Sequence, residues 1–379
     1  MMRRNSSLGS VGFSARGGRS RRRHGGSSKL PYLILIGILI VLLGIAAFLW
    51  VRRSPAAHVS SVPATTETDS ENGVISLDNA SAPADDSLEG VIAQAKLLAD
   101  GYDYDGAINL LSSSTYASDE SVTAAIDEYN ATKETLVRAD PRKVTHVFFH
   151  TLIMDTSKAF DGDSREKGYN QVMTTKDEFM KILQSMYERG FVLVRLHDVA
   201  YEVTAEDGSR HFQEGDIMLP EGKKPFVMSQ DDVCYYEYMD GDGFASRMII
   251  GEDGKPTNEM KMDDGSVSVG SYDLVPLLDD FIKEHPDFSY RGAKACIAFT
   301  GYNGILGYRT DSAYNTDEYK AEHPDFNFEE ERANAAKVVQ CLRDDGFEIA
   351  SHRATATWVR SQWINSVKIP INGQMKSKR

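Results

Sequence analysis

The sequence predicts a mixed α/β domain with a parallel sheet or (β/α) barrel, preceded by a transmembrane helix and a small α-helical segment. Three observations predict this organisation: an apolar run near the N-terminus, a helical pattern over residues 88–140, and alternating strand and helix patterns over 141–352. Strands separated by helical patterns of this length imply crossover connections and parallel pairing.

The N-terminal region has the pattern of a retained membrane anchor. Residues 1–30 hold eight Lys/Arg and no acidic residue, and they are expected to form a basic cytoplasmic tail. Residues 31–51 are expected to form the transmembrane helix, because 33–51 is apolar throughout and long enough to cross the hydrocarbon. The positive-inside rule then places the C-terminal domain outside the cell. A cleaved signal peptide is the alternative, although its apolar core is usually about 7–15 residues long.

The composition after the anchor narrows the class of partner. Residues 52–87 are rich in Ser, Thr, Ala, Pro and Asp and are expected to form a flexible linker. Beyond Arg53, 32 Lys/Arg face 56 Asp/Glu, and an exported part this acidic argues against nucleic acid as a partner. Three cysteines make neither a disulfide framework nor a zinc knuckle.

Residues 88–140 read as a helical hairpin of the tetratricopeptide-like kind, with a further helix around 122–137. A turn is expected at 101–105, between two helices with apolar faces. One hairpin cannot form a solenoid, so this segment is expected to be a spacer or a packing element.

From residue 141 onward, strand and helix patterns alternate. The predicted strands are residues 144–152, 191–196, 225–229, 293–300 and 347–351. The predicted helices are residues 175–189, 272–285 and 329–345. In parallel sheets and barrels of this kind, chemistry gathers at the carboxyl ends of the strands.

Two of these strand ends carry chemically informative side chains. Asp231 and Asp232 follow the apolar run at 225–229, and aromatic and apolar residues come next, so the pair does not read as a solvated charge cluster. His352 ends the last predicted strand. An acid pair with a histidine suits a hard or borderline metal ion with a carboxylate base beside it.

The order of these motifs resembles that of the polysaccharide deacetylases of the NodB-homology type, carbohydrate esterase family 4. The resemblance covers about residues 144–352, and its most informative segment is Ser-Gln-Asp-Asp-Val at 229–233. The other matching segments are residues 148–150, 189–194, 294–299 and 346–352. The resemblance implies a distorted (β/α) barrel for 141–352.

The resemblance also implies roles for individual residues. Asp231 resembles the general base that activates the metal-bound water, and Asp232 resembles a metal ligand. His352 resembles the first of two metal-binding histidines. The implied cofactor is a divalent metal, with zinc first and cobalt or nickel as alternatives. His150 matches a family histidine and is a candidate for substrate binding, whereas His146 and His197 read as structural or exposed.

The chain departs from the family pattern at several positions. Gln230 replaces a phenylalanine, Val233 replaces a glycine, and Ala356 stands where the second histidine is expected. Residues 353–379 form an atypical basic tail with six Lys/Arg and no acidic residue, and the later family motifs are not recognisable. A shifted reading frame can encode an acidic amphipathic helix containing a histidine. The hypothesis is therefore a frameshift near Arg353, which would leave the barrel incomplete.

The predicted function is metal-dependent removal of N-acetyl groups from amino-sugar polymers. The protein is expected at the cell membrane as a single-pass protein, with a cell-wall or extracellular polysaccharide as its partner. The alternative is a non-catalytic glycan-binding or envelope scaffold module with an incomplete metal site. A glycoside hydrolase with two carboxylates is a third interpretation, but it does not account for His352.

Overall fold

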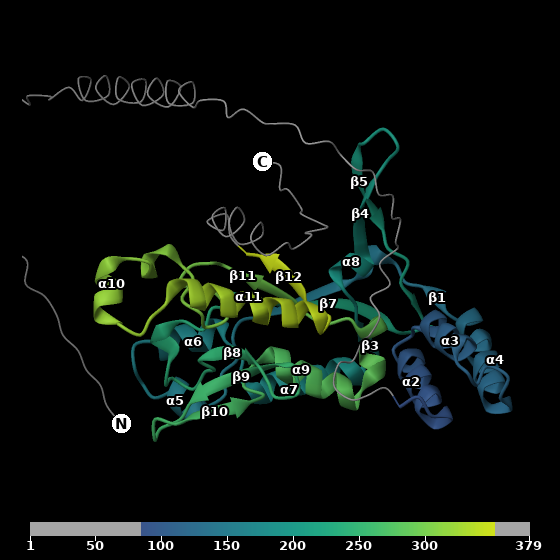
Figure 1. Cartoon of the computed structure of the whole chain (residues 1–379), viewed down its shortest axis with the longest axis horizontal. Helices are drawn as coiled ribbons and strands as arrows, with labels where there is room; N and C mark the ends of the chain where they lie inside the picture. The colour runs from purple at the N-terminus through teal and green to yellow at the C-terminus, as the bar shows by residue number, and fades with distance from the viewer. Residues whose placement is uncertain (1–84, 353–379) are drawn as a thin grey trace, which may run out of the picture. The chain divides into compact units, whose positions relative to one another are not determined.

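The computed structural model describes residues 85–352, which lie within one compact unit of the chain. Its centre is a five-stranded sheet in which every pairing is parallel (Figure 1). The strands are β2 (Thr145–Phe149), β3 (Phe191–Leu193), β7 (Lys224–Asp231), β11 (Cys296–Phe299) and β12 (Glu348–Ser351). The predicted mixed α/β class with a mostly parallel sheet is confirmed. Over the described residues this sheet is open and does not close into a barrel.

Strand β7 organises the sheet, because it pairs with β2, β3 and β11. The remaining strand, β12, pairs with β11. The register sets Phe148 of β2 opposite Ser229 and Ala298 of β11 opposite Asp231. Parallel pairing therefore brings the carboxyl ends of β7, β11 and β12 to one edge of the sheet.

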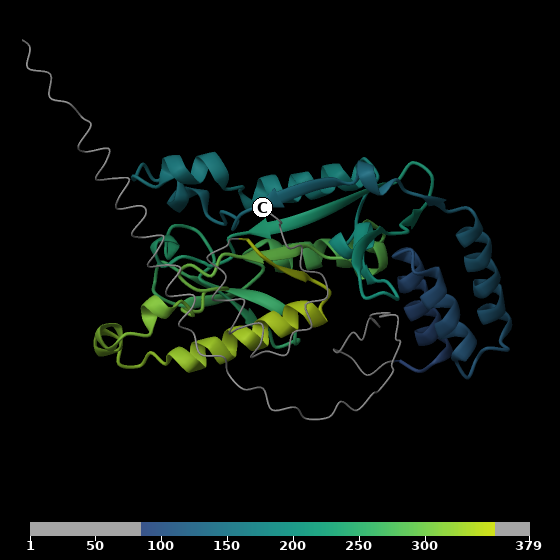
Figure 2. The ribbon, with the colours of Figure 1, turned by 90° about the horizontal axis from the view of Figure 1, so that it is seen from above.

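Helices cover one face of the sheet. They are α7 (Lys176–Glu188), α9 (Leu274–Glu284) and α11 (Phe328–Asp344). Their apolar sides share one core with Phe226 and Met228 of β7, and Figure 2 shows α11 running beside the sheet. Because side chains alternate along a strand, Ser229 and Asp231 point to the opposite face. On that face Phe148 is 57% exposed.

The predicted helices form for local reasons that the sequence carries. Helix α7 begins with a complete capping box between Thr175 and Glu178, and Phe179 and Leu183, four residues apart, are both fully buried. Gly190 follows the helix with φ of 75°, a left-handed conformation that glycine adopts without strain.

Several elements were not predicted. Two antiparallel pieces are the hairpin β4 (Ala200–Thr204) and β5 (Arg210–Glu214), which stands off the sheet in Figure 1, and the meander β8 (Arg247–Ile250), β9 (Pro256–Lys261) and β10 (Val267–Gly270). Smaller elements are β1 (Val137–Arg138), β6 (Met218–Leu219), α5 (Thr156–Ala159), α6 (Glu166–Val172), α8 (Leu196–Val199) and α10 (Asp317–Glu322). Short 3₁₀ helices span Pro141–Lys143, Glu237–Met239, Pro286–Phe288, Tyr290–Gly292 and Ser312–Tyr314. Strand β5 is exposed along its whole length, so it lacks the apolar alternation that indicates a strand.

The helical segment packs directly on the α/β part. It consists of α2 (Leu88–Asp100), α3 (Tyr104–Ser113) and α4 (Glu120–Glu134). Its buried side chains share a second core with Val192, Val194 and Val227 of the sheet region. Polar contacts reinforce the junction, since the Tyr102 hydroxyl donates to the carbonyl of Asp287 at 2.7 Å. Within residues 85–352 this segment is a packing element.

Several predictions concern residues outside the described part of the chain. They are the basic tail 1–30, the transmembrane helix 31–51, most of the linker 52–87, and the tail 353–379. None of the helices within residues 85–352 has the length and apolar character needed to cross a membrane.

Candidate functional site

The candidate site begins where β7 ends. Its residues from Pro225 to Gln230 are buried, and Asp231 closes the strand. The backbone then turns sharply: Asp232 has φ of 57° and Tyr235 φ of 52°, and the amide of Cys234 donates to the carbonyl of Asp232 at 2.7 Å. Left-handed φ in non-glycine residues costs on the order of 1 kcal/mol or more and is found where surrounding contacts enforce it.

The structure brings Asp231, Asp232 and His352 together. His352 follows β12, and its amide donates to the carbonyl of Phe299 at 2.9 Å, which anchors it beside β11. Its imidazole Nδ1 lies 3.2 Å from Asp232 Oδ1, and its Nε2 lies 3.6 Å from Asp231 Oδ2. Asp232 and His352 lie 120 positions apart in the sequence. They meet because β7 and β12 both pair with β11 in parallel, which brings their carboxyl ends to the same edge of the sheet.

Two of these side chains suit a divalent cation. Asp232 Oδ1 is buried and has no hydrogen-bond partner, since its approach to the imidazole lacks hydrogen-bond geometry. Two donors held by one tetrahedral zinc ion lie roughly 3.4 Å apart, close to the 3.2 Å found here. Within residues 85–352, however, no three His, Cys, Asp or Glu side chains are grouped to hold a metal. The described residues thus offer two candidate donors at this position, not a complete metal site.

A buried polar network lies directly beneath the acid pair. The Asp273 carboxylate, just before α9, is fully buried and accepts from Gln230 Nε2 at 2.8 Å and from the Tyr235 hydroxyl at 2.6 Å. It also accepts from the amide of Leu152 at 3.0 Å, and Asn258 Nδ2 donates to the Tyr235 hydroxyl at 3.0 Å. Burial outweighs these hydrogen bonds and raises the pKa of Asp273.

This network explains why β7 carries a glutamine at position 230, where the resemblance noted from the sequence predicts a phenylalanine. Gln230 points to the helix-covered face, where the motif has a phenylalanine, and its amide binds a buried carboxylate instead of filling an apolar space. Asp273 was not among the predicted site residues, because in the sequence it reads as a helix N-cap ahead of an apolar run. A signal was present in the polar Gln230 within an otherwise apolar strand, because a buried amide requires a polar partner.

A pocket opens beside Asp232. Its volume is about 350 Å³. Its lining residues are His150, Thr151, Val172, Met173, Asp232, Tyr236, Tyr238, Met239 and Tyr302. The rings of Tyr236 and Tyr238 stack at 5.3 Å with 14° between their planes, and Tyr302 is 66% exposed. Burial raises the pKa of Tyr236 to about 12, so its phenol is neutral and can donate a hydrogen bond at neutral pH.

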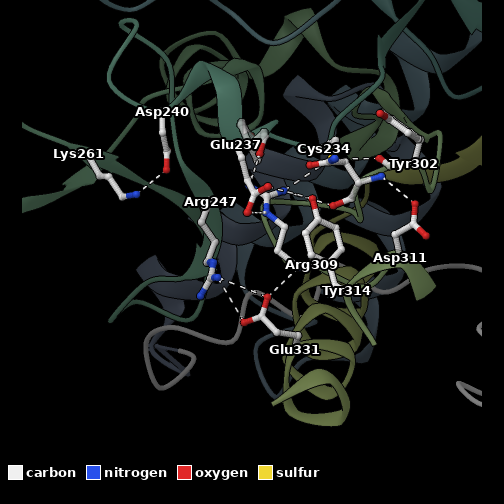
Figure 3. Close-up of polar contacts among 12 residues, drawn as sticks. Cys234, Glu237, Asp240, Arg247, Lys261, Tyr302, Arg309, Asp311, Tyr314 and Glu331 are labelled. Atoms are coloured by element: carbon white, nitrogen blue, oxygen red, sulfur yellow. Dashed lines mark hydrogen bonds and ion pairs between the residues drawn. The ribbon is translucent and has the colours of Figure 1, made fainter. Parts of the chain in front are cut away.

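Arg309 links the segment that carries Tyr236 and Tyr238 to the segment that carries Tyr302, and Figure 3 shows Arg309 beside Glu237 and Tyr314. The buried guanidinium donates from Nη2 to the carbonyl of Tyr235 at 2.8 Å and from Nη1 to that of Asn303 at 3.4 Å. Its Nε lies 3.6 Å from Glu237 Oε1, and the Tyr314 hydroxyl donates to the other oxygen of Glu237 at 3.0 Å. Two of the segments that line the pocket, those carrying Tyr236 and Tyr302, are thus linked through one cation.

The other predicted histidines lie in different surroundings. His150 lines the pocket, and its Nδ1 lies 3.1 Å from the carbonyl oxygen of Val172. His146 contacts the Ser229 hydroxyl, and His197 contacts the Glu348 carboxylate. Of the histidines named from the sequence, only His352 contacts the acid pair in the described residues.

Fold and site define a class: a parallel α/β protein with α7, α9 and α11 packed on one face of its central sheet and a carboxylate–histidine cluster at the strand ends. Comparison with known proteins adds no narrower class, because no family model, curated protein or solved structure matches the chain.

Proposed function

We propose that this protein is a membrane-anchored polysaccharide deacetylase-like hydrolase that removes N-acetyl groups from extracellular amino-sugar polymers. The observation that carries the proposal is the meeting of Asp231, Asp232 and His352 at one edge of the sheet. The order of the motifs along the chain does not by itself show whether these three side chains meet. The proposed fold of 141–352 is the front part of a distorted (β/α) barrel, consistent with α7, α9 and α11 on one face of an open parallel sheet.

The proposed chemistry divides the three side chains by their surroundings. Asp232, with its unpartnered buried oxygen, and His352 would hold a divalent cation, zinc first and cobalt or nickel as alternatives. When bound, such a cation polarises the acetyl carbonyl and acidifies water. Asp231 Oδ2 lies 3.6 Å from the other ring nitrogen of His352, Nε2, and this carboxylate would accept the proton of the attacking water.

The pocket beside Asp232 supports an amino-sugar substrate. Sugar rings present apolar C–H faces together with hydroxyl and amide groups, and a binding site for them combines aromatic walls with a few polar groups. Tyr236, Tyr238 and Tyr302 supply rings and phenols, and His150 and Thr151 lie at the same pocket. The proposed membrane anchor at 31–51 would hold this site at the outer surface, facing cell-wall polysaccharide.

A second candidate function is non-catalytic glycan binding. One specific observation favours it: within residues 85–352, no three His, Cys, Asp or Glu side chains are grouped to hold a metal. The same pocket would then bind a glycan that is not hydrolysed, and the protein would act as an envelope module.

The decisive experiment measures metal content and acetate release together. The full-length chain in detergent micelles is supplied with zinc and given chitotetraose, the tetramer of N-acetylglucosamine. We expect retained metal and released acetate, with Asp232→Ala losing both. Asp231→Asn should keep the metal but lower the rate of acetate release by about 100-fold or more.

The matched control is Asp325→Asn, an exposed carboxylate in the loop before α11, which should change neither quantity. A chain that retains no metal and releases no acetate would contradict the deacetylase proposal. Calorimetric binding of chitotetraose by such a chain would favour the glycan-binding alternative instead.

A further inference from the structure

Two hydrogen bonds link His146 of β2 to Asp231 through the side chain of Ser229. His146 Nε2 of β2 lies 2.9 Å from the Ser229 hydroxyl, and this hydroxyl lies 3.1 Å from Asp231 Oδ1. Alternation along β7 places Ser229 and Asp231 on the same face of the sheet, and Ser229 itself is buried. His146 therefore reaches Asp231 through one enclosed hydroxyl.

The direction of each hydrogen bond follows from what the groups can donate. An ionised carboxylate only accepts, so the single hydroxyl proton of Ser229 points to Asp231. The serine oxygen must then accept from His146, which requires the imidazole to carry its proton on Nε2. Each tautomer of neutral imidazole donates through one nitrogen only, so the arrangement selects one of the two.

We propose that Ser229 and His146 are positioning residues that hold the Asp231 carboxylate in one orientation. The inference rests on the proposed function, because it concerns the base of that reaction. Oδ1 of Asp231 accepts the hydrogen bond from Ser229. The other oxygen, Oδ2, faces His352 and lies 3.6 Å from its Nε2. The water-facing oxygen of Asp231 is thereby fixed, and a fixed proton acceptor lowers the entropic part of the barrier.

The tautomer of His146 tests the hydrogen-bond chain without any need for activity. Nitrogen NMR is recorded on the full-length chain with labelled histidine in detergent micelles, at pH of about 8, where unperturbed histidine side chains are neutral. The signals of His146 among the nine histidines are those lost in His146→Gln. We expect the Nε2–H tautomer in the wild type and in Ser229→Thr, and loss of this preference in Ser229→Ala.

A matched control keeps the comparison specific. Ser268→Ala removes another serine hydroxyl that contacts an aromatic side chain, that of Tyr272 at 2.7 Å, and should leave the signals of His146 unchanged. A wild-type His146 in the Nδ1–H form would overturn the proposal, because Ser229 would then donate to the histidine. Signals unchanged in Ser229→Ala would overturn it as well.

Kinetics on chitotetraose separate positioning from simple folding. Ser229→Ala should lower kcat by about tenfold or more with KM unchanged, and Ser229→Thr should restore it. Acetate release at the wild-type kcat in Ser229→Ala would overturn the positioning role while the deacetylase proposal stands. If neither the wild type nor any variant releases acetate while His146 keeps the Nε2–H tautomer, the proposed function is overturned. The hydrogen bonds from His146 through Ser229 to Asp231 would then have a structural role only.

Discussion

Asp273 supports the backbone around the acid pair from a fully buried position. Its carboxylate binds Gln230 of β7, Tyr235 of the following turn and the amide of Leu152 after β2. These contacts hold Tyr235 in its left-handed conformation, three residues after Asp232. Burial of a carboxylate without a cation is costly, and full hydrogen bonding is what makes it tolerable.

Replacing this carboxylate should change how stability depends on pH. Burial raises the pKa of Asp273 in the folded state, so the folded protein binds this proton more readily than the unfolded chain does. Protonation of the Asp273 carboxyl therefore stabilises the folded protein. This stabilisation is complete below the pKa that the group has in the unfolded chain, about 4, and it is lost as the pH rises through the higher pKa of the folded protein. The unfolding free energy of the wild type relative to Asp273→Asn should therefore fall as pH increases from about 4.

Urea denaturation of both proteins at a series of pH values measures this difference. Asp325→Asn serves as the control, since its carboxylate is exposed and its difference from the wild type should stay nearly constant. A wild-type advantage that grows with pH would show that Asp273 ionises more readily in the folded protein than in the unfolded chain.

At the scale of elements, two loops act as one unit because they share hydrogen bonds and a cation. The amides of Leu306 and Gly307 donate to the carbonyls of Val233 and Cys234 at 3.0 and 2.7 Å, respectively. Arg309 adds a buried guanidinium to the same junction. The pocket walls that carry Tyr236 and Tyr302 therefore have a common support.

Arg309→Met should loosen both walls together. It leaves the carbonyls of Tyr235 and Asn303 without their charged donor, at a cost of about 2–4 kcal/mol in unfolding free energy. Arg309→Lys should fall between this variant and the wild type, because an ammonium cannot reproduce the planar fork of a guanidinium. Hydrogen exchange should accelerate in residues 233–239 and 301–308 of the methionine variant.

Arg210→Met provides the comparison, since Arg210 lies on the exposed strand β5 and is 71% exposed in its side chain. It should leave the exchange of both loops unchanged. Acceleration in only one loop of Arg309→Met would contradict the view that they form a single unit.

At the scale of the whole molecule, the helical segment and the α/β part share a continuous interface. Ala95, Ala107 and Leu111 are fully buried in the core that also contains Val192 and Val194. The amide of Arg291 donates to the carbonyl of Gly101 at 2.7 Å, beside the Tyr102 hydroxyl contact. Such a packed and hydrogen-bonded junction couples the folding of its two sides.

Tyr102→Ala should therefore destabilise residues 85–352 as one unit. Loss of this buried ring should cost about 3–5 kcal/mol, and circular dichroism and intrinsic fluorescence should report the same transition. Leu97→Ala, at a side chain that is 47% exposed on α2, should cost far less. Two separate transitions, with only the helical one shifted, would identify the segment as an independent spacer.

Local patterns predicted much of the fold because their signals lie within a few residues. The apolar spacing of Phe179 and Leu183 indicated α7, and the apolar run before Asp231 indicated β7. The position of Asp231, Asp232 and His352 at strand ends followed from the same patterns. The exposed hairpin β4–β5 was missed because it buries little and so lacks a periodic signal.

The sequence by itself determined the parallel α/β class and the positions of Asp231, Asp232 and His352 at strand ends. Only the tertiary structure decided which side chains touch: His352 meets the acid pair, His150 lines the tyrosine pocket, and His146 reaches Asp231 through Ser229. It also supplied Asp273 and Arg309, whose partners Gln230 and Tyr235 lie 43 and 74 positions away. The physical reason is that a buried polar group is satisfied by whichever partner packing brings near, and periodicity along the chain carries no record of that choice.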